Sequence, residues 1–130
     1  MKTLLPPGWP RPKGYANAVS AIGRPIFTAG IIGWDEEERL VAPDLPGQLR
    51  QILLNTLAVL AEGGAGPEHV VRMTWYVVDV EEYRAGLAEI GAVYKAIMGR
   101  NYPAMAVVQV SGLVEPGARI EIETTAVVPE

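Results

Sequence analysis

The sequence contains no cysteine and only one histidine, His69. Without cysteine the chain can form no disulfide, offer no thiol nucleophile and hold no metal through thiolates. A single histidine also excludes most histidine-built metal sites and makes a Ser/His catalytic triad a poor candidate. The composition therefore gives no reason to predict a metal centre.

Basic residues and long apolar segments are also scarce. The chain has 11 Lys and Arg against 15 Asp and Glu, a formal net charge of −4 at pH 7, whereas nucleic-acid affinity depends mostly on Lys and Arg that neutralise phosphates. No apolar run approaches the ~20 residues of a membrane span, and the amino terminus lacks the apolar core of a signal peptide. We therefore expect a soluble, cytoplasmic protein that binds neither nucleic acid nor membrane.

The remaining composition is that of a globular protein. With 130 residues, 49% of them hydrophobic and 20% charged, the chain is long enough for one domain with its own core. Residues 1–14 contain four prolines and two glycines, and proline lacks a backbone donor. We expect an extended arm without regular hydrogen bonding over residues 1–14, at the start of a single domain spanning residues 1–130.

Hydrophobic periodicity predicts two helices. Apolar residues recur every three or four positions over residues 45–60, Asp44 is a candidate N-cap, and two glycines at residues 63–64 end the helix. A second apolar stripe predicts a helix over residues 81–98. Strand patterns cover residues 18–30 (with a hairpin turn at residues 23–25), 70–79, 104–111 and 118–128. The order β-β-α-β-α-β-β predicts an α+β fold with both helices on one face of a mixed sheet.

Alternation along the last strand separates the two faces of this sheet. The even positions 120–126 suit a core under the helices, whereas Glu121 and Glu123 point the other way. We assign Met105 and Val107 of the preceding strand, together with Gln109, to the face of the two glutamates. A face that is half apolar and half charged is typical of an oligomer interface, so we expect the chain to associate through it.

Short motifs are spread along the chain: Gly14-Tyr15, Phe27-Thr28-Ala29-Gly30, the helix from Gln48 to Glu62, Val70-Val71-Arg72-Met73-Thr74 with Val78-Asp79, Tyr102-Pro103-Ala104, and Ile120-Glu121-Ile122-Glu123. Each is weak alone, but from Gly14 to Val128 they together resemble the Rid family, the YjgF-like reactive-intermediate deaminases. The resemblance implies a chorismate-mutase-like fold, homotrimers, and small-molecule ligands in the clefts between subunits. It also implies hydrolysis of 2-aminoacrylate-type enamines and imines to 2-keto acids, without a metal or organic cofactor.

Several positions of the implied cleft depart from this resemblance. Met105 stands where the deaminating members have an arginine that holds the substrate carboxylate, a role that suits the bidentate guanidinium. Ile31, Gly91 and Val107 likewise stand in place of a usual glutamine, asparagine and cysteine. The cleft should therefore be more apolar, which favours a changed ligand over simple decay of the site.

Four further residues are candidates for the site. Glu121 matches the glutamate that lies beside the substrate in deaminating relatives and could activate water; alternatively, it is a surface residue paired with Arg119. Tyr15 matches a tyrosine that closes the cleft, or else it pins the arm to the body. Trp34 lies in a loop that borders the cleft in relatives, where it could stack on a ligand or cover a neighbouring subunit. Arg119 could also replace the missing cation.

Two functions are compatible with these residues. The first is a cofactor-free deaminase with Glu121 as catalytic base, acting on an enamine, an imine or an amino-substituted metabolite such as a product of aromatic-ring catabolism. Because Met105 replaces the arginine, we expect little activity on 2-aminoacrylate. The alternative is a non-catalytic trimer of the same fold that binds a small molecule.

Overall fold

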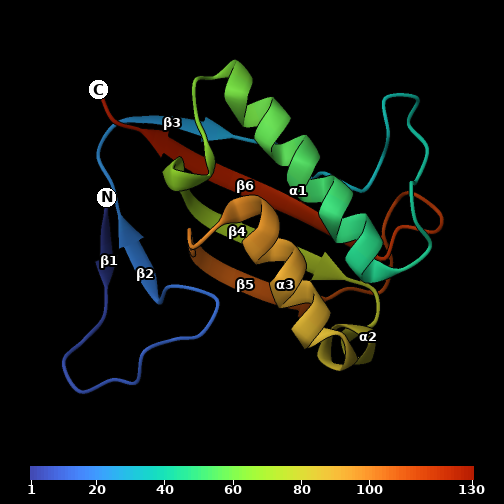
Figure 1. Cartoon of the computed structure of the whole chain (residues 1–130), viewed down its shortest axis with the longest axis horizontal. Helices are drawn as coiled ribbons and strands as arrows, with labels where there is room; N and C mark the ends of the chain where they lie inside the picture. The colour runs from blue at the N-terminus through green and yellow to red at the C-terminus, as the bar shows by residue number, and fades with distance from the viewer.

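A computed structural model describes all residues from 1 to 130. The strands are β1 (Lys2–Leu4), β2 (Ala18–Ser20), β3 (Arg24–Phe27), β4 (Val70–Val77), β5 (Ala104–Gln109) and β6 (Ile120–Val128). The helices are α1 (Leu45–Glu62), α2 (Val80–Ala85) and α3 (Leu87–Met98), with a short 3₁₀ helix at Pro67–His69. Figure 1 shows the long helices lying across a central sheet, with β1 and β2 beside it.

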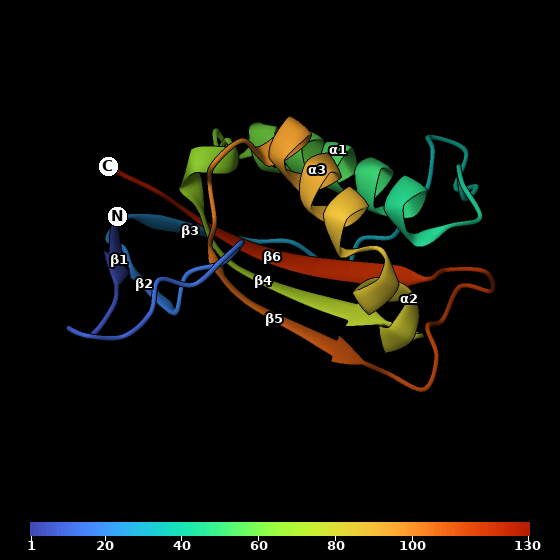
Figure 2. The same ribbon diagram turned by 60° about the horizontal axis from the view of Figure 1, so that its bottom comes forward.

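The central sheet has four strands in the order β3-β6-β4-β5. The pairs β3/β6 and β6/β4 are antiparallel, whereas β4 and β5 run parallel, which makes the sheet mixed. Helices α1 and α3 lie on one side of this sheet, and the opposite face carries no helix (Figure 2). The predicted α+β class, with helices on one face of a mixed sheet, is confirmed.

Helix α1 forms where the periodicity predicts it. The Asp44 carboxylate accepts the backbone N–H of Gly47 at 3.1 Å, Pro46 lies in the first turn, and Gly63 ends the helix. Its buried side contributes four leucines and Ile52 to a core completed by β4, β6 and α3. This core fixes the helices above the sheet.

The predicted helix over residues 81–98 is interrupted. Asp79 caps α2 by accepting the N–H groups of Glu81 and Glu82. At Gly86, α2 ends and α3 begins, and the Gly86 N–H donates to Glu82 and Tyr83 carbonyls. Apolar periodicity continues across Gly86, so the stripe alone does not reveal the break.

The amino-terminal segment differs from the sequence prediction in two ways. Within the expected arm, residues 2–4 form β1, which pairs antiparallel with residues 18–20 of β2. The expected hairpin at residues 23–25 is absent, because β2 and β3 belong to different sheets and Arg24 already pairs with Val128 of β6. Four prolines did not prevent pairing because residues 2–4 precede all of them.

The face assigned to β5 was wrong. In the parallel pair, Met105 lies opposite Met73 and Val107 opposite Trp75 of β4, and residues paired across a ladder share a face. Both therefore face the helices, where they pack against the core. Glu121 pairs instead with Tyr76, on the face without helices. The small residues Ala104 and Ala106, together with Val108, take the place beside the glutamates.

Candidate functional site

Two of the surface hollows contain most of the candidate residues. The first, here called the aromatic hollow, lies along the edge strand β5, beneath α2 and α3, and encloses about 520 Å³. Its principal lining residues are Tyr15, Trp75, Tyr83, Tyr94, Tyr102 and Met105. Lys13 at its margin is the one charged residue among those that line it.

Aromatic rings form one continuous wall of this hollow. Trp75 meets the Tyr83 ring edge-on, with centroids 6.4 Å apart, and lies 6.2 Å from Tyr94 at a tilt. Tyr102 stacks on Tyr94 at 5.5 Å with an interplanar angle of 18°. Three elements position these rings. Trp75 is one of the buried residues that alternate along β4, and Tyr83 and Tyr94 are contributed by α2 and α3.

Hydrogen bonds and burial fix these rings. The Tyr94 hydroxyl donates to the Asn101 carbonyl at 2.5 Å, and burial raises the pKa of the Tyr94 phenol above its ordinary range. Burial likewise raises the pKa of the Tyr83 phenol. Both hydroxyls therefore stay protonated at neutral pH and can act as donors, although that of Tyr94 is already engaged.

Tyr15 reaches the hollow from the amino-terminal segment. The N–H of Ala16 donates to the Pro103 carbonyl at 2.9 Å, which ties this segment to the start of β5. The buried Ala16 leaves its neighbour Tyr15 half exposed at the rim. The same attachment positions Lys13, two residues earlier.

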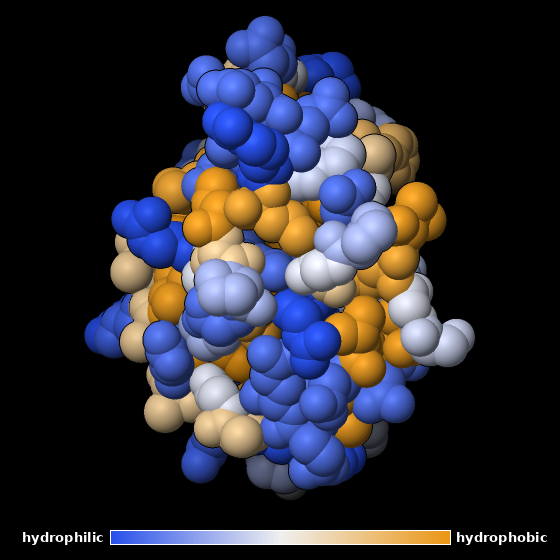
Figure 3. All heavy atoms as spheres, turned by 90° about the vertical axis from the view of Figure 1, so that its right-hand side faces the viewer, coloured by the Kyte–Doolittle hydropathy of each residue, from blue (hydrophilic) through white to orange (hydrophobic).

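The second hollow, here called the acidic hollow, lies away from β5, where residues 30–34 run beside β6 and α1. It encloses about 480 Å³ and is lined by Ile31, Trp34, Asp35, Glu36, Glu115 and Glu121, among others. Four carboxylates and no Lys or Arg line it. Figure 3 views the end of the molecule that carries the loops flanking this hollow, where apolar and hydrophilic groups alternate.

Glu121 occupies the acidic hollow because residue 30 is glycine. A Cβ built on Gly30 would lie 2.1 Å from the Glu121 Oε2 atom, far inside contact distance. The Glu121 carboxylate makes no ion pair within the chain. The neighbouring Glu123 is engaged differently, since it accepts the Tyr76 hydroxyl at 2.6 Å, and this bond raises the pKa of the Tyr76 phenol.

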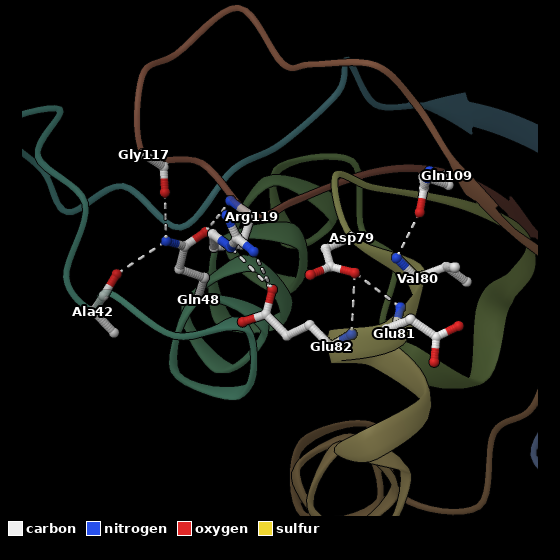
Figure 4. A network of polar contacts seen from close by, with 9 residues as sticks. All are labelled: Ala42, Gln48, Asp79, Val80, Glu81, Glu82, Gln109, Gly117 and Arg119. Atoms are coloured by element: carbon white, nitrogen blue, oxygen red, sulfur yellow. Dashed lines mark hydrogen bonds and ion pairs between the residues drawn. The ribbon is translucent and has the colours of Figure 1, made fainter.

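Arg119 lies outside both hollows. Its guanidinium contacts Glu82 Oε1 at 2.8 and 2.9 Å, and its backbone N–H donates to Gln48 Oε1 at 2.7 Å. The buried Gln48 amide in turn donates to the Ala42 and Gly117 carbonyls. Figure 4 shows this network, which joins α1, α2 and the loop before β6. The ion pair expected between Arg119 and Glu121 is absent within the chain.

The structure thus sorts the candidate residues into two groups. Tyr15, Gly91, Met105 and Val107 line the aromatic hollow, whereas Ile31, Trp34 and Glu121 line the acidic hollow. Sequence reasoning missed Lys13 and the aromatic wall. Lys13 directly precedes the Gly14-Tyr15 motif, and that adjacency is the one sequence signal that could have found it.

Comparison with known proteins identifies the family of this chain. A sequence model of the family described as Endoribonuclease L-PSP matches residues 10–128. The chain belongs to this family, that of the RutC, YjgF and Rid proteins. The match covers both hollows and leaves only the first nine residues and the last two outside it.

Curated Rid relatives align over most of their length. A RutC family protein of Pyrococcus abyssi is 33% identical over 118 residues, which cover 90% of this chain and 89% of the relative. A Salmonella typhimurium protein named 2-iminobutanoate/2-iminopropanoate deaminase is 31% identical over 116 residues, which cover 87% of this chain and 86% of the relative. A solved Rid-family protein of unknown function from Yersinia pestis has 34% identity and a TM-score of 0.86, with 98% of each chain covered.

No helix combines the length and apolar character that crossing a membrane requires.

Proposed function

We propose that this protein is a cytoplasmic, cofactor-free deaminase of the Rid type, which hydrolyses an enamine or imine at a site shared by two subunits of a homotrimer. One observation carries the proposal. Met105 and Glu121 lie on opposite faces of the sheet, in hollows that share no lining residue. A site that uses both must join the aromatic hollow of one subunit to the acidic hollow of the next.

Charge supports this pairing of hollows. The aromatic hollow has Lys13 and no carboxylate, whereas the acidic hollow has carboxylates and no cation. Surfaces of opposite charge favour association and fix its register. A head-to-tail contact of two different patches closes into a ring when the rotation permits, and three subunits would then contain three equal sites.

The uncovered face of the sheet supplies a surface for the trimer. Ala104, Ala106 and Val108 lie there beside Thr74 and Tyr76 of β4, and Phe27 of β3 is 73% exposed. A face of small and apolar residues that no helix covers is suited to burial against another subunit. Charged residues interspersed on this face, Arg72 among them, would set its orientation.

Glu121 is the group in the acidic hollow best suited to activate water. Its carboxylate would accept a proton as the water oxygen bonds to the imine carbon, giving a carbinolamine. The proton then passes to nitrogen, the C–N bond breaks, and ammonia leaves behind a ketone. An enamine would first take up a proton at carbon to become the imine. The printed name of the Salmonella typhimurium relative supports this reaction class.

Mixed trimers test the shared site. Glu121→Gln disables the acidic hollow, and Met105→Glu places a carboxylate in the aromatic hollow. Each variant alone should release little ammonia from imines formed in situ by an amino-acid oxidase. Unfolding and refolding a 1:1 mixture should restore up to about a quarter of wild-type activity, since random assembly pairs two intact half-sites that often. No recovery in mixed trimers, with each variant folded and trimeric, would refute the shared site.

A second candidate function is a non-catalytic trimer that binds a small molecule in the same clefts. The observation that favours it is the apolar Met105 in the aromatic hollow, where relatives that deaminate have an arginine. Ligand binding without ammonia release from any imine in a broad panel would select this function.

A further inference from the structure

Each polar side chain that lines the aromatic hollow carries an N–H or O–H donor. Its lining side chains include one ammonium, four phenols and one indole, but no carboxylate, amide or imidazole. Neutral phenols can donate, and an ammonium can only donate. A lining of this kind is complementary to a ligand that carries oxygen acceptors and a negative charge.

Trp75 adds an unsatisfied donor. Its side chain is 2% exposed, and its indole N–H is buried without a hydrogen-bond partner. Buried N–H groups are almost always paired, and leaving one unpaired destabilises the folded protein. The Trp75 ring forms part of the wall, whereas its N–H has almost no accessible surface and is not open to a ligand in the hollow.

Lys13 is free to act as the counterion. It makes no ion pair within the chain, although the protein has more acidic than basic residues. Arg119, in contrast, is engaged by Glu82, and Arg24 donates to the Gly63 carbonyl at 2.8 Å. Lys13 is thus the available cation beside Met105.

We propose that the aromatic hollow is a specificity pocket for carboxylates that carry a planar, unsaturated group, with Lys13 as the counterion of the carboxylate and the aromatic wall as the contact surface for the flat group. This assignment rests on the proposed function in so far as the carboxylate belongs to the imine or enamine that is deaminated. Tyr83, Trp75, Tyr94 and Tyr102 form a continuous series of rings, and aromatic pairs gain attraction beyond area burial when rings stack or meet edge to face. A saturated group of similar volume would bury similar area without that gain.

Binding of three matched compounds tests the pocket without any turnover. Isothermal titration calorimetry of the assembled protein should show 3-phenylpropanoate binding roughly 2- to 10-fold more tightly than 3-cyclohexylpropanoate, which differs only in the planarity of its ring. 3-Phenylpropylamine, with an ammonium in place of the carboxylate, should bind more weakly than either. Equal affinity for the phenyl and cyclohexyl compounds would overturn the aromatic selection, and equal affinity for the amine would overturn the charge selection.

Two pairs of variants assign the residues. Lys13→Gln should weaken 3-phenylpropanoate binding roughly 2- to 5-fold and reduce its salt dependence, whereas Lys2→Gln in β1, outside the hollow, should do neither. Tyr102→Leu should abolish the preference for phenyl over cyclohexyl, while Trp9→Leu, which removes an exposed ring outside the hollow, should retain it. Unchanged binding in Lys13→Gln or Tyr102→Leu would refute the role of that residue.

Failure of this inference and failure of the proposed function have different signatures. If the three carboxylate and amine compounds bind in the expected order but no imine releases ammonia, the pocket stands and the deaminase does not. If small aliphatic imines are deaminated while 3-phenylpropanoate neither binds nor competes, the deaminase stands and the specificity pocket is overturned.

Discussion

The side chain of Glu121 lies directly against the backbone of Gly30, in space that any Cβ at residue 30 would occupy. The two residues come from segments about ninety positions apart, brought together because the N–H of Ile31 donates to the Ile122 carbonyl at 2.9 Å. This single close approach sets the position of the carboxylate on which the proposed chemistry depends. Gly30 is therefore a positioning residue, and the size of the side chain at position 30 should control activity.

Gly30→Ala should reduce deamination about 10²-fold while the protein stays folded, because the new methyl group displaces the Glu121 carboxylate. The backbone at residue 30 is not left-handed, so alanine introduces no conformational strain there. Gly112→Ala, whose Cβ would meet no atom within 4 Å, is the matched control and should retain full activity. Steady-state ammonia release by the two variants measures the effect, and circular dichroism checks that they are folded. Full activity in Gly30→Ala would contradict the positioning role.

Glu121→Gln should lower turnover about 10²–10⁴-fold, because the amide keeps the shape of the side chain but cannot accept the proton of water. Trimer assembly should survive. Glu123→Gln is the matched control, since that carboxylate is engaged by the Tyr76 hydroxyl. The opposite pattern, in which Glu121→Gln dissociates the trimer and leaves activity per folded subunit unchanged, would make Glu121 a structural residue.

The sequence predicted those parts of the fold whose two faces differ strongly in polarity. Strand β4 alternates buried Met73, Trp75 and Val77 with more polar residues, as expected. Strand β5 reads Ala-Met-Ala-Val-Val-Gln and is apolar on both faces, so its alternation gives no orientation. Only its parallel pairing with β4 determines which side chains face the helices, and pairing is a property of the whole sheet.

The candidate site was predictable residue by residue but not as an arrangement. Motif resemblance selected seven residues that line one hollow or the other, yet it did not separate them. The register of β5 determines that Met105 and Val107 line a different hollow from Glu121. Short motifs carry no information about strand register. The sequence made Arg119 a candidate for the missing cation but gave no sign of its ion pair with Glu82, because Glu82 lies in α2, 37 residues away.

We expect the protein to form a trimer in solution. Light scattering at micromolar concentration should give three times the chain mass. Val108→Glu should dissociate the trimer, because it places an unpaired charge in the uncovered face of the sheet, where Val108 is 42% exposed. Leu54→Glu makes the same kind of change at a 39% exposed leucine of α1 and should leave the trimer intact. A stable monomer in the unmodified protein would refute the interface and the shared site together.

Alkaline pH should destabilise the protein through Tyr94. Burial holds the pKa of this phenol above its ordinary value of 10.0, so above that pH the unfolded chain loses a proton that the folded chain retains. The unfolded state then binds fewer protons, and the free energy of unfolding falls as pH rises. Tyr94→Phe should be about 1 kcal/mol less stable at neutral pH, having lost the bond to Asn101, but should lose less stability in alkali. Urea unfolding at about pH 8 and about pH 11 measures both effects; identical pH dependence in the variant would exclude Tyr94 as the cause.

Met105→Arg should increase activity on small enamines and imines that carry a carboxylate, such as 2-aminoacrylate and its imine tautomer. The unmodified protein should be slower on them by roughly two orders of magnitude than a relative with arginine, because losing a charge-assisted contact removes a few kcal/mol and each ~1.4 kcal/mol is tenfold in rate. Met105 lines an open hollow, so a guanidinium has room to reach a ligand without entering the core. Met105→Gln, polar but uncharged, is the control and should bring no gain, and Met105→Arg combined with Glu121→Gln should lose what arginine added. If the unmodified protein already matched the Salmonella typhimurium deaminase on 2-iminopropanoate, another cation such as Lys13 would have to perform the role of the arginine, and the changed-ligand interpretation of Met105 would be wrong.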